Sequence, residues 1–143
     1  LRPLLEDMRL LYSARLEECA ATLSIEQVSE RVRIMGDPDQ MRGVLGNLIE
    51  NSLLADATAI TFQTRQTDPY TVLTVSDNGH GMEQDIADRA FELYFTTREH
   101  GTGLGLAHVH RIMSAQNGMV EIQSSGSGTE VLLYFPTQAE VAS

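Results

Sequence analysis

The first twenty residues place apolar side chains at the spacing of one helical face. The members of this face are Leu4, Leu5, Met8, Leu11, Tyr12 and Leu16. Their spacing predicts an amphipathic helix over residues 1–20, with Pro3 tolerated in its first turn. Two shorter apolar runs follow, at 21–28 and 31–35, and they predict a pair of strands joined around Ser29-Glu30.

Strong start signals predict a second helix after these runs. Asp37 is placed as its N-cap, Pro38 in its first helical position, and Gln40 where a capping box would be completed. The predicted helix runs to about Ala55. Its buried face is formed by Met41, Val44, Leu45, Leu48 and Ser52.

A hairpin is predicted after this helix. Residues 58–65 and 70–76 are rich in β-branched and aromatic side chains, and Asp68-Pro69 between them indicates a turn. Asp77 is expected at the end of the second strand, and Gly79 and Gly81 then turn the chain sharply.

The last third of the chain is predicted to hold two helices and two strands. The helices are a short one at 83–90 and a longer one from Gly103 to a C-cap at Asn117-Gly118, and the strands are at 119–124 and 129–135. The segment at 92–102, between the two helices, lacks periodicity. The apolar side of the later helix is Leu106, Val109, Ile112 and Met113. We expect one domain, residues 1–136, followed by a polar tail, 137–143, that frays.

Composition narrows the possible partners. Twenty acidic residues against ten basic ones give a formal charge of -10, which argues against nucleic acid. If an anionic nucleotide binds, a divalent cation and backbone N–H groups must do the work of lysines, which points to magnesium. No apolar run reaches the roughly 18 residues of a membrane span, so we expect no direct membrane contact. The single cysteine suits a reducing compartment, and the chain begins at Leu1, so we expect a cytoplasmic piece of a longer protein.

Two asparagines and one aspartate are candidate ligand-binding residues. Asn47 and Asn51 lie one turn apart on the edge of the predicted helix, and an amide oxygen there suits Mg²⁺, with Asn51 as the candidate ligand. On this pair alone, two helix-surface asparagines without a role are the commoner explanation. Asp77 could accept a hydrogen bond from an exocyclic amine such as that of adenine. For Asp-x-Gly-x-Gly alone, a plain turn is again the commoner explanation.

The glycine-rich segment at 101–106 is more specific. Three alternating glycines, Gly101, Gly103 and Gly105, run directly into a helix. Such a loop lets backbone N–H groups approach phosphate, and the helix N-terminus adds partial positive charge. A dinucleotide-binding fingerprint is excluded by context, because no strand directly precedes this segment.

Together, four segments resemble the ATP-binding catalytic domain of sensor histidine kinases, within the superfamily of gyrase, Hsp90 and MutL. Residues 47–51 look like the asparagine box and 77–81 like the first glycine box, while 91–98 resemble the phenylalanine box and 101–106 the second glycine box. They occur in family order, and they look closest to the nitrogen-regulation type. The resemblance implies a two-layer α/β sandwich of Bergerat type, with a mixed, mostly antiparallel sheet and helices on one face.

The resemblance also implies roles for individual residues. Asp77 would bind the adenine amine through a water network that includes Thr129, and Asn51 would coordinate Mg²⁺. Asn47 and Arg98 would be the catalytic residues beside the phosphates. The implied nucleotide-binding set is Asn47, Asn51, Asp77, Gly79, Gly81, Thr97, Arg98, Gly101, Thr102, Gly103, Leu104, Gly105, Leu106 and Thr129.

Three departures from the family pattern qualify these roles. Hydrolytic relatives have a general-base glutamate where this chain has Asn47, which favours a kinase over an ATPase. Glu50 is no obvious substitute for that base, because it lies about 60° from Asn47 around the helix and toward solvent. Leu54 stands where kinases often have a charged residue. No segment resembles the family's phosphoacceptor box, and none of His80, His100, His108 and His110 is expected to accept phosphate. His108 and His110 are not expected to bind a metal as a pair, because two residues apart on a helix they face different directions.

The sequence therefore predicts a catalytic domain that binds Mg-ATP in two-component signalling. It would donate the γ-phosphoryl group to a histidine on a separate dimerisation domain, from which a response regulator receives it. Whether the parent protein crosses the membrane stays open. Two alternatives also stay open: a serine/threonine kinase of the anti-sigma type, and a non-catalytic module that senses nucleotide.

Overall fold

A computed structural model of the chain describes residues 1–29, 31–34, 36–81, 88, 105–125 and 127–136. The helices are α1 (Arg2–Leu11), α2 (Ser13–Glu18), α3 (Pro38–Leu54) and α5 (Gly105–Ala115). The strands are β1 (Thr22–Glu26), β2 (Ala59–Thr67), β3 (Tyr70–Asp77), β4 (Met119–Ser125) and β5 (Gly128–Pro136). Among these residues, no helix combines the length and apolar character that crossing a membrane requires.

The strands form one sheet in the order β1-β2-β3-β5-β4. β1 pairs with β2 in parallel, and the other three pairings are antiparallel. Successive side chains of a strand point to opposite faces, and on β2 the members facing the core, Ile60 and Phe62, are fully buried. The mixed, mostly antiparallel sheet that the sequence predicted is confirmed.

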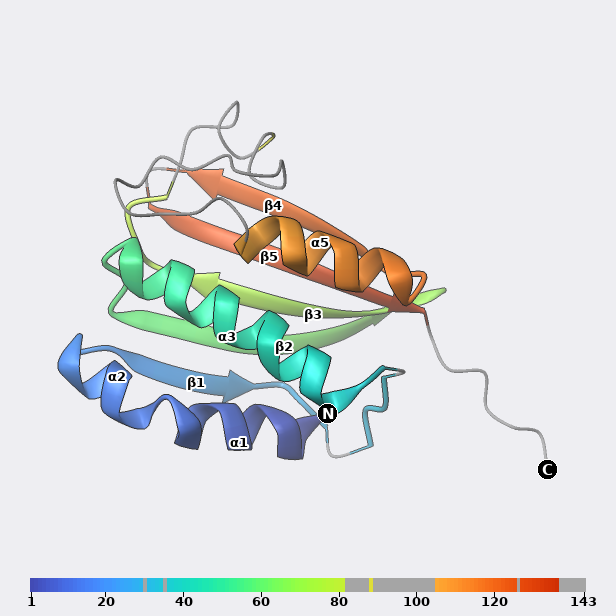
Figure 1. Ribbon diagram of the computed structural model, residues 1–143, viewed down its shortest axis with the longest axis horizontal. Helices are drawn as coiled ribbons and strands as arrows, with labels where there is room; N and C mark the ends of the chain where they lie inside the picture. Colours follow the sequence, from blue (N-terminus) through green and yellow to red (C-terminus); the bar gives the residue numbers. More distant parts are fainter. Residues whose placement is uncertain (30, 35, 82–87, 89–104, 126, 137–143) are drawn as a thin grey trace.

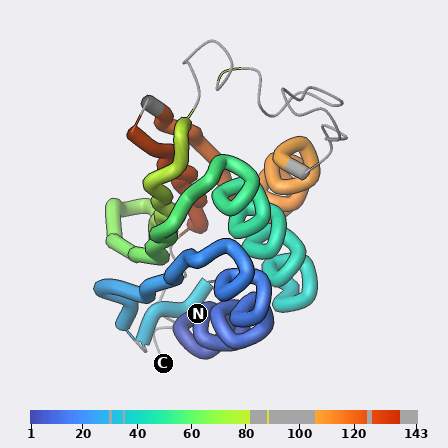
Figure 2. The backbone as a smooth tube through the Cα atoms, turned by 90° about the vertical axis from the view of Figure 1, so that its left-hand side faces the viewer, coloured from blue at the N-terminus to red at the C-terminus, as the bar shows by residue number. Residues whose placement is uncertain are grey.

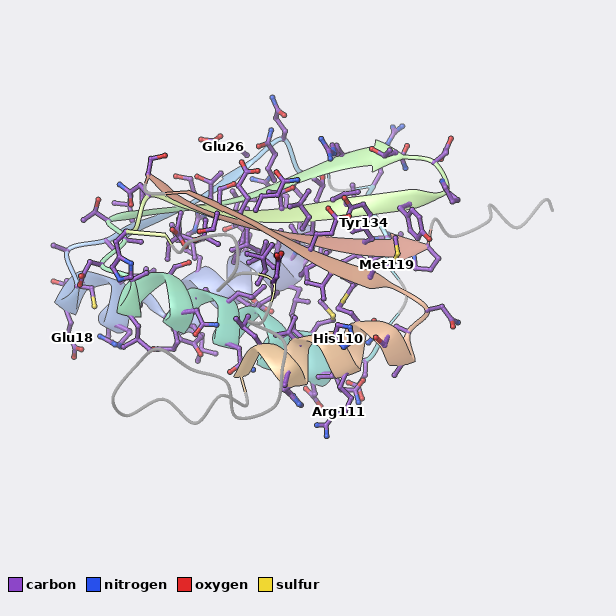
Figure 3. The ribbon with its side chains drawn as sticks, turned by 90° about the horizontal axis from the view of Figure 1, so that it is seen from above. Glu18, Glu26, His110, Arg111, Met119 and Tyr134 are labelled. Carbon is purple, nitrogen blue, oxygen red and sulfur yellow. The ribbon has the colours of Figure 1, made fainter. Side chains whose placement is uncertain are left out.

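All described helices lie on one face of this sheet (Figures 1 and 2). α3 and α5 pack against each other, and α1 packs against α3 and β1. Seen from above, Arg111 of α5 points away from the sheet, while Glu26 and Tyr134 belong to the strand layer on the opposite side (Figure 3). The core fills the space between the two layers, as the two-layer sandwich requires.

Two predictions for the first 35 residues are corrected by the structure. The single helix is two helices, because Tyr12 leaves helical geometry with φ −95° and ψ 8°. Of the predicted strand pair only β1 exists, and it pairs with β2. The carbonyl of Val32 accepts a hydrogen bond from the amino terminus of Leu1 at 3.1 Å, so 31–34 is a connection held by the start of the chain.

The other predicted elements in described residues are confirmed. Asp37 caps α3 through Oδ1, which accepts from the backbone N–H of Asp39 at 2.8 Å, and Pro38 opens the helix. The hairpin forms as β2 and β3, and the final strand pair forms as β4 and β5. After α5 the residue with positive φ is Asn117. The predicted helix at 83–90, apart from residue 88, the segment at 92–102 and the tail at 137–143 lie outside the described residues.

Candidate functional site

Described elements that carry predicted site residues meet at one end of the sandwich (Figure 1). The last turn of α3, the end of β3, the turn from β4 to β5 and the first turn of α5 lie at this end. Antiparallel pairing of β3 with β5 sets Asp77 opposite Thr129. Residues that are 25 to 52 positions apart in sequence therefore meet around one carboxylate.

The Asp77 carboxylate is held by three hydrogen bonds from three parts of the chain. Oδ1 accepts from the backbone N–H of Gly79 at 2.9 Å and from that of Thr129 at 3.3 Å. Oδ2 accepts from the hydroxyl of Ser52 on α3 at 2.7 Å. Bonds to a charged acceptor are stronger than bonds between neutral groups, so this carboxylate is fixed before any ligand arrives.

Thr129 belongs to a second small hydrogen-bond system beside Asp77. Its hydroxyl lies 2.7 Å from the hydroxyl of Ser124 across the β4–β5 pair, and Ser124 also donates to the carbonyl of Gly128 at 3.2 Å. Thr129 is buried, and Asp77 is half-buried. The predicted adenine-binding pair is thus brought together, and Ser124 joins it.

The turn after Asp77 is tied to the end of α3 and the start of β2. The side-chain oxygen of Asn78 accepts from the backbone N–H groups of Thr58 and Ala59 at 2.8 and 2.9 Å. The backbone N–H of His80 donates to the carbonyl of Ala55 at 2.9 Å. At Gly79 a Cβ would lie 2.6 Å from that same carbonyl oxygen, so only glycine allows this close approach.

The α3 edge that carries the two asparagines is buttressed by the α1–α2 junction. Asn47 and Asn51 are both half-buried. Between them, Glu50 receives two hydrogen bonds from the Arg15 guanidinium, Nε to Oε1 at 3.1 Å and Nη2 to Oε2 at 3.3 Å. The side chain of Glu50, predicted to point toward solvent, is 37% exposed, and its carboxylate is also paired with Arg15.

Tyr12 packs against another side of α3, at Gly46. A Cβ added to Gly46 would lie 2.5 Å from the Tyr12 hydroxyl oxygen, so glycine at this helix position makes room for the phenol. Burial raises the pKa of Tyr12, and the nearby charge of Glu50 adds to the rise. Because the folded-state pKa is raised, this phenol contributes stability below its unfolded pKa near 10, and that contribution is lost as the pH rises through the folded pKa.

The structure describes eight of the fourteen residues of the predicted nucleotide-binding set. They are Asn47, Asn51, Asp77, Gly79, Gly81, Gly105, Leu106 and Thr129. Thr97, Arg98, Gly101, Thr102, Gly103 and Leu104 lie outside the described residues. Leu54, the departure from the family pattern, is 50% exposed. Within the described ranges no group of three or more His, Cys, Asp or Glu side chains is arranged to hold a metal ion.

Ser52 is the site residue that the sequence reasoning placed elsewhere. Its position on the apolar face of α3 led to its assignment to the core, and it is indeed only 4% exposed. A signal was present in the sequence, since a lone hydroxyl among buried apolar positions needs a hydrogen-bond partner. That partner is Asp77.

The chain is similar in sequence to a known family and to individual kinases. Residues 36–139 match the model of the family described as histidine kinase-, DNA gyrase B-, and HSP90-like ATPase. The chain is 36% identical over 106 residues to the sensor histidine kinase ZraS of Escherichia coli, covering 72% of this chain and 23% of that protein. It is 32% identical over 110 residues to sporulation kinase C of Bacillus subtilis, covering 75% and 26%.

Solved structures agree with the fold. The catalytic domain of histidine kinase ThkA superposes with a TM-score of 0.85 at 21% identity, covering 96% of this chain and 92% of that one. Full-length ShkA in complex with AMPPNP has a TM-score of 0.83 at 29% identity, covering 96% and 30%. The chain spans about a quarter of ZraS and of sporulation kinase C. On the family match, the chain belongs to the histidine kinase-, DNA gyrase B- and HSP90-like ATPase family.

Proposed function

We propose that this chain is the catalytic and ATP-binding domain of a sensor histidine kinase. It binds Mg-ATP and, joined to a dimerisation domain, donates the γ-phosphoryl group to a histidine there. A response regulator then receives the phosphoryl group, and the chain works in the cytoplasm, where ATP is present. The names of ZraS and sporulation kinase C, and the AMPPNP in the ShkA structure, support this assignment.

The observation that carries the proposal is the carboxylate of Asp77. An ionised carboxylate only accepts hydrogen bonds, so it matches the exocyclic amine of adenine and opposes a carbonyl oxygen at the same place. Gly79, Thr129 and Ser52 donate to it at 2.9, 3.3 and 2.7 Å, which fixes its orientation. The base end of the site is therefore organised in advance for an amine.

The α3 edge supplies the phosphate end. The amide oxygen of Asn51 is the kind of ligand that Mg²⁺ prefers, and its position on a half-buried helix edge fits an ion that keeps several waters. Magnesium, when bound, neutralises phosphate charge. Asn47, one turn earlier, hydrogen-bonds phosphate or water. Arg98 and the N–H groups of 101–106 complete this end in the proposal and close over the phosphates.

A kinase explains this edge better than a hydrolase does. Activating a water for hydrolysis takes a general base, and the amide of Asn47 has no basic group. Glu50 is the nearby carboxylate on α3, and both of its oxygens accept from Arg15. With positioning groups and no free base among the described residues of this α3 edge, the site suits transfer to a separate nucleophile.

Calorimetric titration with ATP and Mg²⁺ tests the base end directly. We expect Asp77→Asn to weaken ATP binding at least about tenfold, because a hydrogen bond to a charged group is lost. The control is Asp68→Asn, an exposed aspartate in the turn at the opposite end of β3, which should bind as wild type does. A wild-type chain without measurable nucleotide affinity would sink the proposal.

The acceptor is tested by supplying it. Mixed with a histidine-bearing dimerisation domain and labelled ATP, the chain should produce acid-labile phosphohistidine, and alone it should turn over ATP slowly. Acid-stable phosphoserine on a partner protein would favour the anti-sigma type of kinase. Nucleotide binding without transfer to either acceptor would favour the non-catalytic alternative. Rapid steady hydrolysis of ATP would favour a true ATPase.

A further inference from the structure

Ser52 is a buried hydroxyl on the otherwise apolar face of α3. It is 4% exposed, on a face that also buries Leu48, Ile49 and Leu53. Serine is a poorer helix former than alanine, and an unbonded hydroxyl in the core is unfavourable. Its hydroxyl donates to Oδ2 of Asp77 at 2.7 Å, which is the short distance expected for a donor to a carboxylate.

The hydrogen bond from Ser52 changes how many acceptor sites of Asp77 remain for a ligand. A carboxylate offers about four lone-pair sites, two on each oxygen. The backbone N–H groups of Gly79 and Thr129 occupy both sites of Oδ1. Ser52 occupies one site of Oδ2. One acceptor site remains, and it is on Oδ2.

The second anchored oxygen also fixes the plane of the carboxylate. The last torsion of an aspartate side chain is broad, so bonds to Oδ1 alone would leave Oδ2 free to swing. Ser52 approaches from α3, whereas Gly79 and Thr129 approach from the turn after β3 and from β5. Donors from both layers of the sandwich therefore set where the remaining site points.

We propose that Ser52 is a positioning residue for base recognition, whose hydroxyl orients Asp77 so that its one remaining acceptor site meets one N–H of an exocyclic amine on the nucleotide base. The inference rests on the proposed function, because it takes Asp77 as the base-binding residue. It adds that Ser52 acts through Asp77 and contributes to affinity only when the base carries that amine. Ser52 need not touch the nucleotide.

The test is a thermodynamic cycle in which one change removes the Ser52 hydroxyl and the other removes the amine of the base. The affinities are measured by calorimetry on the 143-residue chain. The ligands are ATP and purine riboside triphosphate, which lacks the 6-amino group. We expect Ser52→Ala to weaken ATP binding by about three- to tenfold and to leave binding of the amine-free analogue within about twofold of wild type. Ser52→Thr, which keeps the hydroxyl, should restore the preference for ATP over the analogue.

Because the readout is the ratio of two affinities, a general loss of folded protein cancels. Thr64→Val is the matched control. It removes a buried hydroxyl that donates to the carbonyl of Gln27 at 3.1 Å, four residues along β2 from Ile60, which pairs with Asp77. It should lower the melting temperature and leave the ratio unchanged. Equal weakening of both ligands by Ser52→Ala, or no weakening of ATP, would overturn this inference alone. Failure of the wild-type chain to bind ATP would overturn it together with the proposed function.

Discussion

The two ends of the site are held in place by different means. At the base end, Asp77 receives hydrogen bonds from α3, from its own turn and from β5. At the phosphate end, the edge of α3 is supported from behind, by the phenol of Tyr12 against Gly46 and by Arg15 on Glu50. The proposed base end is defined by contacts to Asp77 itself, and the proposed phosphate end by contacts to the helix that carries Asn47 and Asn51.

The difference indicates how each end should respond to change. A group that is directly hydrogen-bonded loses its orientation when one donor or the local backbone is disturbed. A scaffold that is supported by packing moves as a unit, so a disturbance there is shared by Asn47 and Asn51. Disturbing the base end should therefore change recognition of the base, and disturbing the α1–α2 junction should change the response to magnesium.

The largest effect is expected at the turn that brings β5 to Asp77. Gly128 has φ +145°, and a Cβ there would lie 2.1 Å from the backbone oxygen of Asp77. We expect Gly128→Ala to lower the free energy of unfolding by at least about 2 kcal/mol, through backbone strain and overlap together. Nucleotide binding should fall as well, because the Thr129 N–H moves away from Asp77. Chemical denaturation and titration with ADP measure both effects.

Gly43→Ala is the control for this substitution. Gly43 is an exposed residue inside α3, and the nearest atom to an added Cβ is His108 Nε2 at 4.0 Å. Alanine there should raise the free energy of unfolding by up to about 1 kcal/mol, since glycine is unfavourable in a helix interior. Similar destabilisation by both substitutions would contradict the account of Gly128.

The next largest effect is expected at Asn51, because only the proposed phosphate end of the site needs a metal ion. Asn51→Ala should weaken binding of ATP in the presence of Mg²⁺ at least about tenfold, the lower end of what even outer-shell partners of a metal contribute. Binding of ADP with a chelator present should hardly change, because the base end is intact. Gln40→Ala, which removes an exposed amide from the first turn of the same helix, is the control. A metal-independent loss would argue against Asn51 as the ligand.

The smallest effect is expected at the contact behind the α3 edge. Gly46→Ala should cost about 1 kcal/mol of stability, the lower end for overpacking, because the group it meets is the end of a side chain. In the double variant with Tyr12→Phe the nearest ring atom, Cζ, would lie at 3.4 Å, so stability should recover. Thermal melts of the four proteins give the coupling energy. Additive losses would show that Tyr12 does not press on Gly46.

Local signals in the sequence were sufficient for the central elements. Asp37 and Pro38 start α3 as predicted, because a side-chain cap and a preset φ act within one turn. The β2–β3 hairpin likewise needs only its own two strands and the turn at 68–69. Asp77 and Thr129 were linked through the family resemblance, and the register of β3 with β5 brings them together.

The errors share a physical cause, which is a partner distant in sequence. Residues 31–34 alternate as a strand does, yet the Val32 carbonyl is bonded to the amino terminus of Leu1. Tyr12 fits the apolar spacing of one long helix, yet α1 ends there and its ring packs on α3. Ser52 was placed correctly on the buried face, but its hydrogen bond to Asp77 was missed. None of these partners is visible within a local window of sequence.

The parallel strand β1 has a consequence for where this domain can be cut. The family match begins at residue 36, but Leu5, Met8, Leu16 and Leu23, all before it, belong to the same hydrophobic core. A fragment that starts at residue 36 would uncover one backbone edge of β2 and open the core beside Ile60 and Phe62, and exposed strand edges invite aggregation. The segment that matches the family is thus smaller than the segment that builds the core.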